Sequence, residues 1–236
     1  MREKIIVAID LQEREALNTL LEELRGEAKF VKVGMELFYT FGPEIVIKLK
    51  QMNFKVFLDL KVHDIPNTAK KTLKTITKLG ADIINVHALG GAKMLQAAVE
   101  GIDEAIAEDS NLIRPKLIGV TQLTSTTSES LNKDLGIEIN LEQNIIHLAK
   151  LCYQNKLDGV VCSAFEVEDI KNATSEDFIC ITPGIRPKAT PNDDQKRVMT
   201  PIQALKAGSD FLVIGRPITQ ATSPKEAYLD IAQEIR

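Results

Sequence analysis

Short apolar runs rich in valine and isoleucine alternate along the chain with longer stretches in which apolar residues recur at helical spacing. This alternation is typical of repeated βα units that build a parallel sheet. The sequence predicts eight strands, at residues 5–10, 30–34, 55–60, 83–87, 116–121, 159–162, 178–181 and 211–214. No linker, composition shift or low-complexity tract separates the units. We therefore expect an α/β fold, a single (β/α)8 TIM barrel forming one catalytic domain over residues 1–236, rather than an open doubly wound sheet.

Composition narrows the range of partners. The 236 residues include 29 basic and 33 acidic side chains, mixed along the chain, with a formal net charge of −4. They form no basic block that could follow a phosphate backbone, so we expect no nucleic-acid partner. No apolar run approaches the roughly 20 residues that span a bilayer, and the first residues lack the pattern of a signal peptide. We expect no membrane association and a cytoplasmic location.

The three cysteines, Cys152, Cys162 and Cys180, are odd in number and lack the C-x-x-C spacing typical of zinc sites. All three lie in apolar or helical stretches. We expect buried, inert thiols rather than a disulfide framework or a metal site.

Charged residues occur inside or at the end of three apolar strands. The first predicted strand ends in Asp10, the second contains Lys32, and the third runs through Asp59 and leads directly into Lys61. Residues two apart share one face of a strand, so Asp59 and Lys61 should point the same way, about 6.6 Å apart. A lone strand lysine is more often an edge or surface residue. On neighbouring strands of a barrel, however, these charges must neutralise one another, which makes the group a functional-site candidate.

A second carboxylate, Asp64, follows just past the third strand, in a loop before Pro66. Loops at the strand ends of a barrel favour a functional role. The structural alternative is a favourable negative charge at a helix N-terminus. His63 could belong to the same site, but it could also simply cap a helix or pack against its neighbours. His87, at the end of the fourth strand, could line the pocket, although a structural role is the simpler interpretation.

The last two strands offer a phosphate site, since barrels often bind phosphate there. Gly215 and Arg216 follow the eighth strand, where glycine lets backbone N–H groups approach an anion and arginine supplies a forked, charged donor. Arg186 follows the seventh strand and opens a polar stretch over residues 186–200. Its length predicts a lid over an anion, with a disordered insertion as the alternative.

With these residues assembled, the chain resembles the orotidine 5′-phosphate decarboxylase family from end to end. The Asp-x-Lys-x-x-Asp run is the most specific part of the match. The matching segments are Ala8-Ile9-Asp10, Val31-Lys32-Val33-Gly34, Asp59-Leu60-Lys61-Val62-His63-Asp64-Ile65-Pro66-Asn67-Thr68, Val120-Thr121-Gln122-Leu123-Thr124-Ser125, Pro183-Gly184-Ile185-Arg186, Asp194-Gln195 and Val213-Ile214-Gly215-Arg216-Pro217-Ile218.

The resemblance implies decarboxylation of orotidine 5′-phosphate to UMP and CO2, the last step of de novo UMP synthesis, without metal, flavin or Schiff base. It implies a homodimer with shared active sites. Lys61 would be the proton donor in a charged array of Lys32, Asp59, Lys61 and Asp64, with Asp64 and Thr68 reaching in from the other subunit. The remaining implied contacts are Asp10 to ribose, Thr124 and Ser125 to the pyrimidine, and Gln195, Gly215 and Arg216 to phosphate, with Arg186 in the supporting loop.

Two alternatives differ in chemistry. A magnesium-dependent sugar-phosphate decarboxylase or synthase of the same superfamily would resemble this chain in barrel and Asp-x-Lys-x-x-Asp run, but it typically has a metal-binding glutamate on the second strand. Lys32 occupies that position here and would repel a divalent cation. A barrel kept only as a binding scaffold would be expected to lose at least one of the four charged residues, and all four are present.

Overall fold

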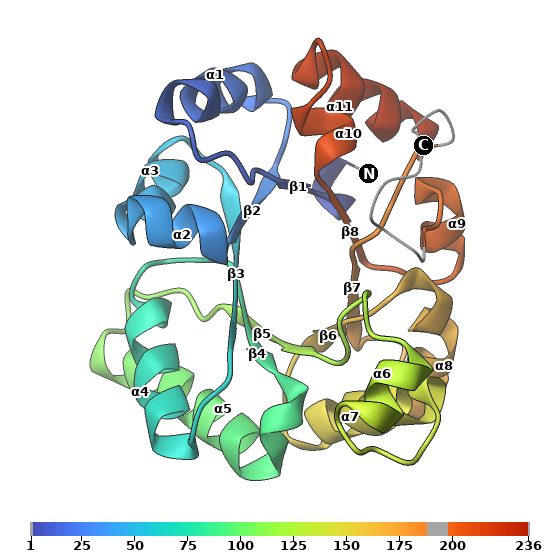
Figure 1. Cartoon of the computed structure of the whole chain (residues 1–236). Coiled ribbons are helices and arrows are strands. Elements are labelled where there is room, and N and C mark those ends of the chain that lie inside the picture. Colours follow the sequence, from blue (N-terminus) through green and yellow to red (C-terminus); the bar gives the residue numbers. More distant parts are fainter. Residues whose placement is uncertain (1, 188–197, 236) are drawn as a thin grey trace.

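The computed structural model describes residues 2–187 and 198–235. Eight parallel strands close into a barrel in sequence order, with the last strand paired to the first. Figure 1 looks along the barrel and shows the helices arranged around the ring of strands. The predicted TIM barrel is confirmed. The strands are β1 (Ile5–Ala8), β2 (Phe30–Gly34), β3 (Lys55–Val62), β4 (Ile83–His87), β5 (Lys116–Val120), β6 (Gly159–Val161), β7 (Ile179–Thr182) and β8 (Phe211–Ile214).

The helices follow the strands along the chain, and three short 3-10 turns accompany them. The α-helices are α1 (Arg14–Leu24), α2 (Met35–Phe41), α3 (Glu44–Gln51), α4 (Pro66–Thr77), α5 (Gly91–Glu108), α6 (Ser128–Lys133), α7 (Leu141–Gln154), α8 (Val167–Ala173), α9 (Pro201–Lys206), α10 (Arg216–Thr219) and α11 (Pro224–Glu234). The 3-10 turns are η1 (Arg2–Lys4), η2 (Ala88–Gly90) and η3 (Ala164–Glu166). Every helix in the described part of the chain is too short or too polar to cross a membrane.

Most predicted strands match within one residue at each end, but the first and third differ by two. Strand β1 ends at Ala8 instead of residue 10, because the chain then turns so that Leu11 N donates to the carbonyl of Ile9 at 2.8 Å. Strand β3 continues to Val62, because pairing with β4 resumes there after an irregularity. Asp10 therefore lies beyond its strand, whereas Lys61 lies within its own.

The core has two layers, as expected for a barrel whose strand residues alternate between the interior and the helices. The larger layer lies between strands and helices and includes Leu58 and Ile84. The smaller layer fills the barrel interior, with members Ile6, Ala8, Phe30, Phe57, Ile83, Ile118, Ile181 and Val213. Interior positions nearer the carboxyl ends of β2, β3 and β4 hold Lys32, Asp59 and Asn85. Apolar packing thus stops there and a polar site begins.

The three cysteines are free and buried, as predicted. Burial raises the pKa of Cys152 to about 12. A hydrogen bond with Cys180 and burial raise the pKa of Cys162. Both groups are therefore neutral thiols at neutral pH, and the thiol form is a poor nucleophile.

Candidate active site

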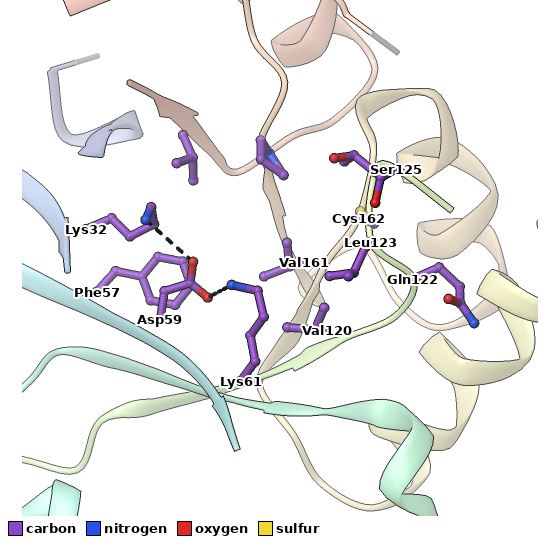
Figure 2. A pocket seen from close by; sticks show the side chains of 13 residues that line it. Lys32, Phe57, Asp59, Lys61, Val120, Gln122, Leu123, Ser125, Val161 and Cys162 are labelled. Atoms are coloured by element: carbon purple, nitrogen blue, oxygen red, sulfur yellow. Dashed lines mark hydrogen bonds and ion pairs between the residues drawn. The ribbon is translucent and has the colours of Figure 1, made fainter. Parts of the chain in front are cut away.

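A cavity of about 400 Å³ opens at the carboxyl ends of the strands. This is the end at which TIM barrels carry their sites, and the volume is that of a small-molecule pocket. Figure 2 shows Lys32, Asp59 and Lys61 on one side and the segment from Val120 to Ser125 on the other. The lining residues are Lys32, Phe57, Asp59, Lys61, Val120, Gln122, Leu123, Thr124, Ser125, Val161, Cys162, Pro183 and Val213.

Four predicted residues form a charged cluster, Asp10, Lys32, Asp59 and Lys61. The Nζ atom of Lys61 lies 2.7 Å from Oδ1 of Asp59. The Nζ atom of Lys32 lies 3.7 Å from Oδ2 of Asp59 and 3.2 Å from Oδ1 of Asp10. The two ammonium groups and two carboxylates alternate and sum to zero formal charge. The side chains of Asp59 and Lys32 are each only 12% exposed, so this mutual pairing offsets much of their desolvation.

Gly34, at the end of β2, leaves room for the ion pair between Asp10 and Lys32. A Cβ atom at this position would lie 2.9 Å from Oδ1 of Asp10 and 3.0 Å from Nζ of Lys32. Any larger residue would therefore push the Asp10–Lys32 pair apart.

Asp59 in the cluster and His87 at the end of β4 have shifted pKa values. Burial acts to raise the pKa of Asp59, but the charges of Lys32 and Lys61 outweigh it and the pKa lies below its usual value. Burial, with smaller contributions from His63 and Lys61, lowers the pKa of His87 to about 4. The His87 ring stacks on that of His63, 5.6 Å between centroids, and its Nδ1 accepts from Leu89 N at 3.4 Å. At neutral pH Asp59 on the cavity wall is therefore ionised, whereas His87, at the end of β4, is neutral.

Asp64 and Thr68 lie apart from the cluster in the described chain. Both are exposed, and Oδ1 of Asp64 accepts from the neighbouring Ile65 N at 2.7 Å. Within residues 2–187 and 198–235, Asp64 forms no ion pair. Helix α4 has Ile65 as its N-cap and no side-chain cap bond, so Asp64 does not act as a capping residue.

The predicted phosphate residues lie around the ends of β7 and β8. A Cβ atom at Gly215 would lie 3.4 Å from Cβ of Ala8, so the turn into α10 passes directly against β1. Arg216 is the first residue of α10. Arg186 is 8% exposed, and its Nη1 donates to the carbonyl of Ile185 at 3.0 Å. Gln195, and with it most of the predicted lid, lies outside the described residues.

Sequence reasoning missed two residues that build the site, Asn85 and Gln122. Asn85 on β4 is fully buried and its Nδ2 donates to Oδ1 of Asp59 at 2.7 Å. Gln122 lines the cavity while its Nε2 donates to Oδ1 of Asn144 at 2.9 Å, which ties the β5–α6 connection to α7. Strand alternation could have indicated Asn85, because it shares the interior face of β4 with Ile83. No periodicity marks Gln122, which lies after its strand.

In the described part of the chain, no three or more His, Cys, Asp or Glu side chains come together in a group that could hold a metal ion.

Comparison with known proteins places the barrel in a family. A family model described as "Orotidine 5′-phosphate decarboxylase / HUMPS family" matches residues 3–231. The chain belongs to this family. The orotidine 5′-phosphate decarboxylase of Streptococcus uberis is 52% identical over 230 residues, which cover 97% of this chain and 96% of the relative. That of Enterococcus faecalis is 49% identical over 235 residues, which cover 99% of this chain and 98% of the relative.

Solved structures agree with this assignment to the orotidine 5′-phosphate decarboxylase / HUMPS family. The crystal structure of the orotidine 5′-phosphate decarboxylase from Lactobacillus acidophilus matches with a TM-score of 0.88 at 40% identity, covering 99% of both chains. The family match runs from η1 to α11 and so includes every strand of the barrel. As a member of the family, the chain is an enzyme, a carbon–carbon lyase.

Proposed function

We propose that this enzyme decarboxylates orotidine 5′-phosphate to UMP and CO2, the last step of de novo UMP synthesis, as one barrel domain without a cofactor. The observation that carries the proposal is the charged cluster at the cavity wall. Loss of CO2 from C6 of the pyrimidine leaves a vinyl carbanion that no adjacent carbonyl can delocalise. A fixed ammonium group is the kind of electrostatic stabilisation that such a carbanion needs.

Lys61 is the proposed proton donor. Its Nζ faces the cavity and is fixed by the 2.7 Å bond to Asp59 (Figure 2). In this position one ammonium group would stabilise the developing charge and then transfer its proton to C6, which forms the C–H bond of UMP and leaves a neutral amine. Asp59 would balance the charge of Lys61 and would face the departing carboxylate, while Lys32 holds Asp59 in place and Asp10, which is paired with Lys32, contacts the ribose.

The rest of the cavity suits a flat ring that carries a phosphate. Phe57, Val120, Val161 and Val213 supply an apolar lining, and Thr124 and Ser125 supply hydroxyl groups for the polar edge of a pyrimidine. We assign the phosphate to Gly215 and Arg216, with Gln195 and the Arg186 loop in support. Gly215 lies against Ala8, two residues before Asp10, and this position favours a ribose between Asp10 and the phosphate.

A partner subunit would complete the site with Asp64 and Thr68. Support comes from large apolar side chains exposed just beyond the ends of four successive strands, an unusual concentration for a surface that faces only water. These are Met35 after β2, Ile65 after β3, Leu89 after β4 and Leu123 after β5. Ile65 is 67% exposed and adjoins Asp64, so a second copy covering it would bring Asp64 into the interface.

Subunit mixing tests the shared site. Asp64→Asn and Lys61→Ala homodimers should each be nearly inactive, whereas hybrids carry one site with an intact Lys61 and an intact Asp64. We expect activity to return on mixing. If subunit exchange is demonstrated by mass spectrometry and no activity returns, Asp64 acts within its own chain.

The presence of Lys32 on β2 argues against a magnesium-dependent sugar-phosphate reaction. Its ammonium lies between the carboxylates of Asp10 and Asp59 and occupies the space in which a cation would have to bind them.

To test the proposed reaction, the purified protein is mixed with orotidine 5′-phosphate and the products are quantified. UMP and CO2 in equal amounts are expected. Unchanged substrate, with the protein folded and dimeric, would exclude the proposal.

A further inference from the structure

Asn85 makes two hydrogen bonds that join the charged cluster to the backbone of β3. Its Nδ2 donates to Oδ1 of Asp59 at 2.7 Å, and its Oδ1 accepts from the backbone N–H of Lys61 at 2.7 Å. The orientation of the amide is fixed by chemistry, because a carboxylate can only accept and a backbone N–H can only donate. Asn85 is fully buried and does not line the cavity.

The second bond replaces a missing part of the barrel ladder. Strand β3 pairs with β4 through Leu58 and Ile84, and pairing resumes at Val62 and Val86. Three residues of β3, from Asp59 to Lys61, therefore lie opposite the single residue Asn85. The bulged backbone loses regular partners, and the side chain of Asn85 supplies the acceptor for Lys61 N.

Lys61 also has an uncommon backbone conformation. Its φ angle is +50°, in the left-handed region that costs a residue with a side chain roughly 1 kcal/mol or more. Such a conformation persists where the surroundings hold it in place. The hydrogen bond from Lys61 N to Asn85 holds the backbone at this residue.

We propose that Asn85 is a positioning residue for the reaction. It fixes the Lys61 backbone through one bond and the Asp59 carboxylate through the other, so that the ammonium group points at the reacting carbon without Asn85 touching the substrate. This inference rests on the proposed function. A displacement of about 1 Å at a catalytic group can cost roughly a hundredfold in rate.

The test uses two variants. Asn85→Ala removes both bonds and should lower kcat about a hundredfold, while KM for orotidine 5′-phosphate and the Kd of UMP stay within about threefold. Asn85→Asp keeps the shape and the acceptor for Lys61 N, but it can donate to Asp59 only when the introduced carboxyl group is protonated. Beside the ionised Asp59 that group should have a raised pKa. The kcat of Asn85→Asp should therefore recover as pH falls, a change that a purely structural role would not produce.

The matched control is Asn155→Ala. Asn155 is also a buried asparagine with two hydrogen bonds, to Gln96 and to the carbonyl of Leu151, but it lies away from the cavity. Its kcat should equal that of the parent even if its stability falls. An inactive parent enzyme would overturn the proposed function itself. If the parent is active and Asn85→Ala keeps kcat within threefold of it, only the positioning role is overturned. If Asn85→Ala does not fold, a kcat of Asn85→Asp that follows the parent's pH profile would overturn that role instead.

Discussion

Replacing Lys61 by alanine should abolish turnover while leaving the barrel intact. The side chain is 26% exposed and contributes little to the core. After its removal, Asp59 keeps the Lys32 ammonium at 3.7 Å and the Asn85 amide at 2.7 Å, so no buried charge is left without a partner. The loss therefore belongs to catalysis rather than to folding.

The size of the effect follows from the two roles of one ammonium group. Two unit charges about 3.5 Å apart, at an effective dielectric constant of about 20, interact by about 5 kcal/mol, which corresponds to roughly a thousandfold or more in rate. Proton transfer from a positioned acid contributes about 10²-fold to 10⁴-fold. Together these predict a fall in kcat of at least about 10⁵-fold for Lys61→Ala.

The assay follows the absorbance of orotidine 5′-phosphate, with UMP binding measured by calorimetry to show that the cavity survives. Lys55→Ala is the matched control, because Lys55 begins the same strand at the opposite end of the barrel, where it lies over the ring of Phe30. We expect this control to keep parental kcat. Turnover of Lys61→Ala within tenfold of the parent would refute the assignment of Lys61 as proton donor.

Three further predictions concern the phosphate, pH and the thiols. Arg216→Ala should mainly raise KM, by roughly ten to a hundredfold for a lost charged contact of about 1.5 to 3 kcal/mol, and should hardly affect orotidine that lacks the phosphate. Equal damage to both substrates would move the phosphate site elsewhere. Because the pKa of His87 is lowered from 6.5 to about 4, the unfolded chain binds a proton that the folded chain does not. Stability should thus fall as pH drops through this range, and the slope, measured by denaturant unfolding, should be smaller in His87→Gln; an identical slope would contradict the shift. A thiol reagent should leave Cys152 unmodified until the protein unfolds, since its thiol is buried with a pKa of about 12, and rapid reaction of the native protein would show that this residue is accessible.

The fold could be predicted from the sequence because each strand carries its own apolar run and each unit repeats the same pattern. The charged cluster could be predicted in part, since Lys32, Asp59 and Lys61 interrupt apolar strands, where isolated charges are costly. The ends of β1 and β3 could not, because they depend on a turn after Ala8 and on an irregularity in β3 that only pairing with β4 defines.

Asn85 shows the limit of reasoning from one strand at a time. On β4 it is one polar residue between apolar neighbours, and alternation indicates only that it faces the barrel interior. Its function depends on which residues of β3 lie opposite. The bulge that sets Asp59 and Lys61 against Asn85 is a property of two strands together.

We propose that the charged side chains of this barrel decarboxylate orotidine 5′-phosphate without a metal ion. The most direct measurement is the loss of orotidine 5′-phosphate absorbance in metal-free buffer that contains excess chelator. We expect an undiminished rate in the chelator. A rate that disappears in the chelator and returns with magnesium would refute decarboxylation by the charged side chains alone.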